Sequence, residues 1–126
     1  ISTFNSQDLA NTLWALAKLD HNPGEDMLNA MFAETRAKIS SFNQYELATT
    51  LWALATLSLN PGEDLVKAIL AETRAKMSSF NASSLTMSMW ALTKLHHNPG
   101  EKIFNAMLAE TSAKISALTR RSFQAP

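Results

Sequence analysis

The segment LANTLWALAKLDHNPGED, residues 9–26, decides the fold because the chain repeats it twice. It returns as LATTLWALATLSLNPGED at residues 47–64 and as LTMSMWALTKLHHNPGEK at residues 85–102, each time after 38 residues. Recurrence at a fixed period of about 20–50 residues is typical of solenoids and related repeat arrays. The sequence therefore predicts an array of 38-residue units.

The repeat accounts for the whole chain. A Phe-Asn pair opens each unit at Phe4, Phe42 and Phe80. The predicted boundaries are 1–3 for the tail of a preceding repeat, 4–41, 42–79 and 80–117 for repeats 1 to 3, and 118–126 for the start of a fourth. Both ends fall inside a repeat, and neither resembles the polar capping repeat that solenoids need. We therefore expect the chain to be part of a longer array.

Each repeat is predicted to begin with a helix that covers residues 6–18 in the first unit. Asn5 and Asp8 have the spacing of a capping box, and Asn43 and Glu46 repeat it in the second unit. In the third unit Ser84 takes the acidic place, which predicts a weaker cap. The first helix of every repeat is thus expected to start at the same repeat position.

A second helix is predicted to begin at Asn22-Pro23-Gly24-Glu25. Asn22 is expected to cap it, Pro23 to occupy its first position, and Glu25 to lie in its first turn. The helix should run to about Ile39 and bury apolar residues, namely Leu28, Met31, Phe32 and Ile39. A turn of about three residues between the two helices favours antiparallel packing.

One such helix pair cannot bury its own apolar surface. The first helix carries Leu9, Leu13 and Leu16 on one side and Ala10, Trp14 and Ala17 on another. Two apolar sides require neighbours on two sides, which is the position of an inner helix in a stacked array. The predicted fold class is all-α, an α-solenoid of antiparallel helix pairs.

Composition argues against several functions. The 126 residues include 11 basic and 11 acidic residues, and this neutrality argues against a strong non-specific grip on nucleic acid. The lack of cysteine excludes disulfides, thiolate metal sites and cysteine nucleophiles. No apolar run approaches the length of a membrane span. His21, His96 and His97 lie in turns without metal-ligand spacing, and no catalytic motif is present. We predict no enzyme activity, no catalytic residue, no metal and no cofactor.

Positions that vary between repeats are the candidates for contact with a partner. At about 100° per residue, positions 7, 11 and 18 fall within about 40° of one another and form a largely polar stripe on the first helix. Amides bond base edges, tyrosine stacks on bases, and lysine meets phosphates. The candidate contacts to single-stranded RNA are Ser6, Gln7, Asn11, Lys18, Gln44, Tyr45, Thr49, Ala82, Ser83, Met87, Lys94, Arg120 and Arg121.

These residues also have structural interpretations. Variable polar residues at the start of a helix are usually solvated surface. The recurring tryptophans could be stacking platforms, but their strict recurrence beside alanines favours packing between repeats: Trp14, Trp52 and Trp90. The pairs Arg36/Lys38 and Arg74/Lys76 suit the negative ends of the second helices, or could form a basic ladder along one edge of the array.

The repeat closely resembles the octotricopeptide repeat. The resemblance rests on the 38-residue period, the string from Leu9 to Leu19 and the Pro-X-Glu helix start that follows, and it covers essentially the whole chain. It implies an RNA-binding helical-repeat protein of a chloroplast or mitochondrion that acts in the stability, processing, splicing or translation of organellar transcripts. The variable positions above match the variable part of that motif. The prolines before the second helix are reduced to Asn-Pro-Gly, and residues 86–89 depart from the expected Ala-Asn-Thr-Leu.

Two functions remain open on the sequence. The first is sequence-selective binding of single-stranded RNA, organellar mRNA or rRNA, with about one nucleotide per repeat. The second is a protein-binding or structural solenoid that is fixed among the protein subunits of a ribonucleoprotein or another large assembly. Neutral charge favours the second, whereas the variable stripe and the family resemblance favour the first.

Overall fold

The computed structural model describes residues 3–95, 105 and 107–115, which contain helices and turns but no strands. The first helices of the repeats are α1 (Ser6–Lys18), α3 (Gln44–Thr56) and α5 (Ala82–Lys94). The second helices are α2 (Glu25–Lys38) and α4 (Glu63–Ala75), each followed by a 3₁₀ turn, η1 (Ile39–Ser41) and η2 (Met77–Ser79). Residues 107–115 are also helical. The predicted all-α class is confirmed.

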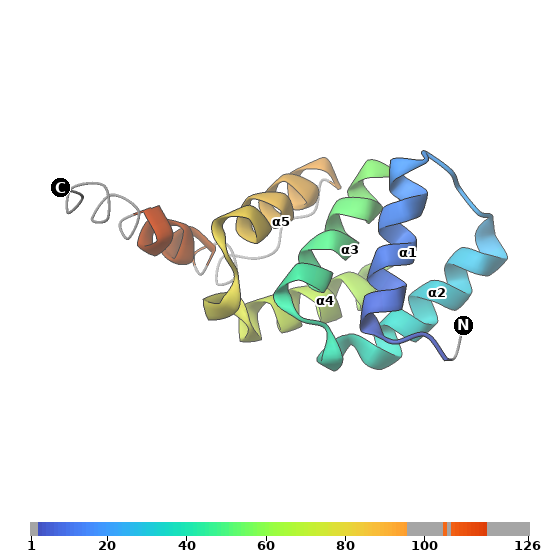
Figure 1. Ribbon diagram of the computed structural model, residues 1–126, viewed down its shortest axis with the longest axis horizontal. Coiled ribbons are helices and arrows are strands. Elements are labelled where there is room, and N and C mark those ends of the chain that lie inside the picture. The colour runs from blue at the N-terminus through green and yellow to red at the C-terminus, as the bar shows by residue number, and fades with distance from the viewer. Residues whose placement is uncertain (1–2, 96–104, 106, 116–126) are drawn as a thin grey trace.

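The helices form two layers. In Figure 1 the first helices α1, α3 and α5 follow one another in one layer, and α2 and α4 lie beneath them. α3 packs against both α1 and α5, and α2 packs against α4. The core between the layers contains leucines of α3, apolar residues of α4 and the phenylalanines that open the second and third repeats: Leu47, Leu51, Leu54, Leu65, Ile69, Phe42 and Phe80. This stacking of helix pairs is the predicted solenoid arrangement.

Asparagine caps start the first helices, as predicted. The Asp8 backbone N–H donates to Asn5 Oδ1 at 2.8 Å, and Asp8 Oδ2 accepts from the Asn5 N–H at 3.0 Å. Asn43 and Glu46 form the same capping box in the second repeat. In the third repeat Asn81 Oδ1 accepts from the Ser84 N–H, and serine returns no bond to the cap. The predicted weakening of the third cap is confirmed.

The start of the second helix differs from the prediction. Helix α2 begins at Glu25, so Asn22 is not its cap and Pro23 is not its first residue. Gly24 is the N-cap with φ of 102°, a conformation outside the helical region that residues with a Cβ rarely adopt. Asn22 Oδ1 instead accepts from the Gly24 N–H at 2.9 Å and closes a short turn before the helix. The second repeat shows the same turn at Asn60 and Gly62.

A lysine at or next to the end of each of the helices α2 and α4 bonds to the start of the same repeat. Lys38 Nζ donates to the carbonyl of Phe4, and Lys76 Nζ donates to those of Phe42 and, at 2.8 Å, Ser40. The same lysines pair with glutamates one helical turn earlier, at 2.9 Å for Glu34–Lys38. Backbone carbonyls and glutamates thus engage Lys38 and Lys76, so these two residues serve the scaffold and do not form a free basic ladder.

The caps give a first prediction about stability. Replacing Asn43 by alanine removes the side-chain acceptor for the Glu46 N–H, and should lower the free energy of unfolding by about 1 kcal/mol. Chemical denaturation followed by circular dichroism measures the change. Asn29→Ala is the matched control, because Asn29 is exposed inside α2 and alanine favours helix. Equal losses in both variants would contradict the capping role.

Candidate nucleic-acid interface

One row of side chains on the first helices is exposed except at Trp52 and Thr56, which are partly buried. Numbering repeat positions by the first repeat, the row consists of positions 7, 14 and 18, which fall within about 40° on a helix. We call it the outer row: Gln7, Trp14 and Lys18 on α1; Tyr45, Trp52 and Thr56 on α3; Ser83, Trp90 and Lys94 on α5. At position 7 all three residues are exposed, and Tyr45 keeps 53% of its surface accessible.

Position 11 does not belong to this row. Asn11 is exposed, but Thr49 is only 1% exposed and Met87 is partly buried. This position lies about 40° to one side of position 7, where the preceding first helix covers it on α3 and α5. Thr49 is therefore not accessible in this structure to a base that approaches from outside the helix layer.

Position 6 turns toward the following first helix. The Ser84 hydroxyl of α5 donates to Oε1 of Gln44 on α3, so this amide joins two repeats. Ser6 is partly buried at the equivalent place, and Ala82 is exposed. Gln44 thus contributes to stacking between repeats. The last two predicted contacts, Arg120 and Arg121, lie outside the described residues.

Two of the three recurring tryptophans are exposed, whereas residues that only pack between repeats are expected to be buried. Trp14 is 40% exposed and Trp90 43%, while Trp52 is partly buried and packs against the cluster around Leu13. Lys18 Nζ lies 5.6 Å from the centroid of the Trp14 ring and 5.8 Å from that of Trp52. Lys94 Nζ lies 6.0 Å from the Trp90 ring. The sequence interpretation as packing residues accounts for only part of what these side chains do.

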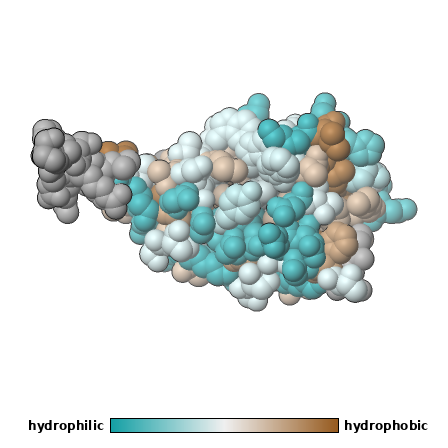
Figure 2. Space-filling view, viewed as in Figure 1, coloured by the Kyte–Doolittle hydropathy of each residue, from teal (hydrophilic) through white to brown (hydrophobic). Residues whose placement is uncertain are grey.

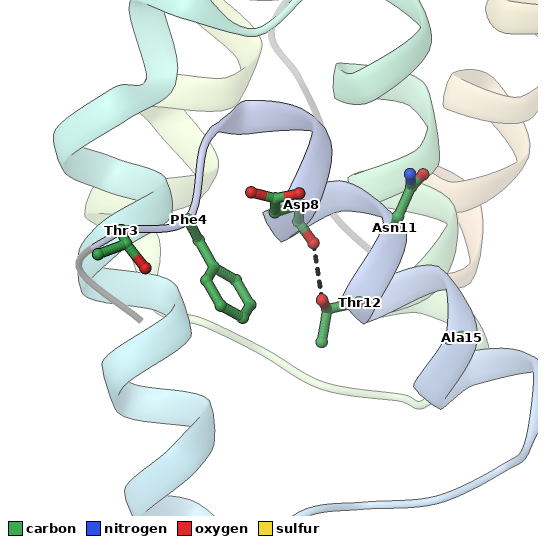
Figure 3. A pocket seen from close by; sticks show the side chains of 6 residues that line it. All are labelled: Thr3, Phe4, Asp8, Asn11, Thr12 and Ala15. Atoms are coloured by element: carbon green, nitrogen blue, oxygen red, sulfur yellow. Dashed lines mark hydrogen bonds between the residues drawn. The ribbon is translucent and has the colours of Figure 1, made fainter.

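A hollow of about 510 Å³ lies on a different side of α1, around Phe4 and Asp8. Figure 3 shows Phe4 beside Asp8 and Thr12, whose hydroxyl donates to the Asp8 carbonyl at 2.7 Å, whereas Asn11 points away from Phe4. Most of the equivalent residues of the next two repeats are buried: Glu46, Thr49, Thr50 and Ala53 on α3, and Ser84, Ser88 and Ala91 on α5. The hollow thus has the form of a helix-packing surface and not of an enclosed ligand pocket.

The face of the molecule seen in Figure 2 has few hydrophobic residues. In Figure 2 hydrophilic residues and residues of near-neutral hydropathy cover most of the visible face, and hydrophobic residues occur as small patches. Within residues 3–95, 105 and 107–115, no group of three His, Asp or Glu side chains could hold a metal ion. None of the helices in the same part of the chain is long and apolar enough to cross a membrane.

The outer row combines three kinds of contact. Gln7, Tyr45 and Ser83 offer different hydrogen-bonding groups in successive repeats, the tryptophans offer ring faces, and Lys18 and Lys94 offer positive charge. No acidic residue belongs to the row. Indole faces and ammonium groups suit the bases and phosphates of a single nucleic-acid strand.

The fold and this surface define a helical-repeat protein of the solenoid class. The chain matches the family described as Tbc2 translation factor, N-terminal domain, over residues 1–124, and it belongs to that family. This agrees with the class that the sequence predicted, although the family's description does not itself mention the octotricopeptide repeat. Neither a curated protein nor a solved structure shows significant similarity to the chain.

The burial of position 11 gives a second prediction. Thr49 Oγ1 is buried and has no hydrogen-bond partner within the described residues, so Thr49→Val should raise the free energy of unfolding by about 1 kcal/mol. Thermal and chemical denaturation measure it. The control is Thr93→Val on α5, where the exposed hydroxyl bonds to the Met89 carbonyl and the change should stay within about 0.5 kcal/mol. Marked destabilisation by Thr49→Val would show that the hydroxyl makes a needed bond.

Proposed function

We propose that this chain binds single-stranded RNA in a sequence-selective manner and acts in organellar gene expression, with about one nucleotide per repeat. The outer row is the observation that carries the proposal. It presents a different exposed residue at position 7 of each repeat, Gln7, Tyr45 and Ser83, on a scaffold that otherwise recurs every 38 residues. The residue at position 7 differs from repeat to repeat while the scaffold stays the same. Such a surface can contact successive nucleotides of different identity.

Membership of a translation-factor family supports a role in translation. The resemblance of the repeat to the octotricopeptide repeat supports the finer assignment to organellar RNA, in a chloroplast or mitochondrion, and extends the role to transcript stability or processing. The partner in this proposal is organellar mRNA or rRNA, and protein subunits of a ribonucleoprotein can contact the rest of the array.

The chain is proposed to be a binding protein and not an enzyme. Several titratable side chains of the described residues lie in capping boxes or ion pairs, as Asp8, Glu46 and Glu34 illustrate. Their places have a structural explanation, and the outer row itself contains amide, hydroxyl, aromatic and ammonium groups. Such groups recognise a nucleic acid without transforming it.

A binding titration tests the proposal. Labelled RNAs of different sequence are titrated with the chain at two salt concentrations, and fluorescence anisotropy gives each Kd. We expect binding that depends on RNA sequence and weakens as salt rises, because lysine–phosphate contacts release counterions. Tyr45→Ala should weaken binding about tenfold, since it removes a stacking and hydrogen-bonding group.

Asn29→Ala is the control for this titration because Asn29 is exposed on α2, in the other helix layer. Its affinity should equal that of the wild-type chain. Absence of RNA binding even at low salt would refute the proposal and favour the protein-binding solenoid. Equal affinity for every RNA sequence would refute the selective part alone.

A further inference from the structure

We propose that the ring faces of Trp14, Trp52 and Trp90 are the surfaces on which the bases of the bound strand stack, and that Lys18 and Lys94 contact the phosphates beside them. This inference rests on the proposed function and adds which side chains supply the part of the affinity that does not depend on RNA sequence. It also assigns a binding role to residues whose recurrence alone favours a scaffold role.

Exposure separates the tryptophans from the recurring scaffold residues. Leucine recurs at position 9, and Leu9, Leu47 and Leu85 are all fully buried. Tryptophan recurs just as strictly at position 14, yet Trp14 and Trp90 keep 40% and 43% of their surface exposed. Trp52, in the intervening repeat, is partly buried. Leaving so large an apolar side chain exposed in the first and third repeats gives up favourable burial, and such exposed aromatic surface commonly marks an interaction site.

The cations of the outer row differ from most of the other described cations, although Arg74 on α4 also forms no ion pair within the described residues. Arg36, Lys38, Lys67, Lys76 and Lys114 each form an ion pair with a carboxylate. Lys18 and Lys94 instead lie over indole rings, at distances between 5.6 and 6.0 Å from the ring centroids. These distances are near the outer limit of about 6 Å for a cation–π contact. A phosphate can therefore draw either ammonium group away from its ring at little cost.

The spacing of the helices explains why stacking surfaces are needed. Packed helices lie about 8–10 Å apart, whereas successive bases in a stacked strand rise by only about 3.4 Å. A strand that places one nucleotide on each repeat must therefore be stretched, and its bases lose contact with one another. An indole ring in each repeat replaces the lost stacking, and Lys18, between Trp14 and Trp52, lies where the backbone passes from one repeat to the next.

In this arrangement the tryptophans and the residues at position 7 of the outer row have different roles in binding. Every base has a flat face, so stacking on tryptophan adds affinity with little regard to sequence. Selectivity then comes from position 7, where Gln7, Tyr45 and Ser83 differ. Loss of a tryptophan should weaken binding to all RNAs by similar factors, whereas a change at position 7 should alter which RNA binds best.

Intrinsic fluorescence offers a test on the unmodified chain. The sequence contains three tryptophans, and all three belong to the outer row, so their emission reports on this row alone. The chain is titrated with short oligouridylate and with the best-binding RNA from the anisotropy series. We expect a saturable quench whose midpoint equals the Kd from anisotropy. Binding by anisotropy without any change in tryptophan emission would overturn the inference and leave the proposed function standing.

Variants test the same point by affinity. Trp14→Leu should raise the Kd for all RNAs about tenfold, and Trp14→Phe, which keeps a ring, should recover most of that loss. Leu19→Ala is the control, because Leu19 is an exposed apolar residue at the end of α1 outside the outer row. Lys18→Gln should reduce the slope of log Kd against log salt concentration by about one.

The outcomes are distinguishable. Circular dichroism must show wild-type helicity for each variant, and Trp14→Phe together with the fluorescence titration keeps the test decisive if Trp14→Leu unfolds. Wild-type affinity in folded Trp14→Leu would overturn the inference. No anisotropy change for the wild-type chain with any RNA would refute the proposed function, and the inference with it.

Discussion

Close packing between successive first helices is the interaction on which the rest of the structure depends. Small residues make it possible: Ala53 of α3 is fully buried in a cluster with Leu13 and Ala17 of α1, and Ala91 of α5 is fully buried in the main core. A larger side chain at either place would push the helices apart. Because the first helices hold their spacing, the residues that face away from the core recur at regular intervals and form one continuous surface.

The sequence predicted the scaffold well because its signals are local. The Asn-X-X-Asp and Asn-X-X-Glu caps fix where α1 and α3 begin, and the recurrence of the repeat carries the same start to α5. The start of α2 was predicted two residues too early. Asn-Pro reads as a cap followed by a first helical residue, but the positive φ of Gly24 delays the helix to Glu25.

The candidate surface was only partly predictable, because exposure depends on what neighbouring helices cover. Positions 11 and 14 lie about 40° and 20° from position 7, on opposite sides of it. A helical wheel cannot tell which of these sides meets the preceding repeat. Polarity favours position 11 as a contact residue and apolarity argues against Trp14. The stacking of the helices nevertheless buries Thr49 and leaves Trp14 and Trp90 exposed. The formal charge was equally uninformative, since several lysines serve ion pairs and backbone carbonyls.

The two sides of each first helix contact different neighbours, and this limits how the length of such an array can change. On α3, the side with Glu46 and Thr50 meets the preceding repeat, while Gln44 reaches the following one. The contact is therefore head-to-tail, and the same sides of the first helices meet at both described junctions, α1 with α3 and α3 with α5. A whole unit of 38 residues can be gained or lost with every junction preserved. A single inserted residue inside a first helix, by contrast, turns the later side chains of that helix by about 100° and takes its part of the outer row out of line with the other repeats. Insertions that preserve the outer row therefore add whole repeats or fall in the turns between helices.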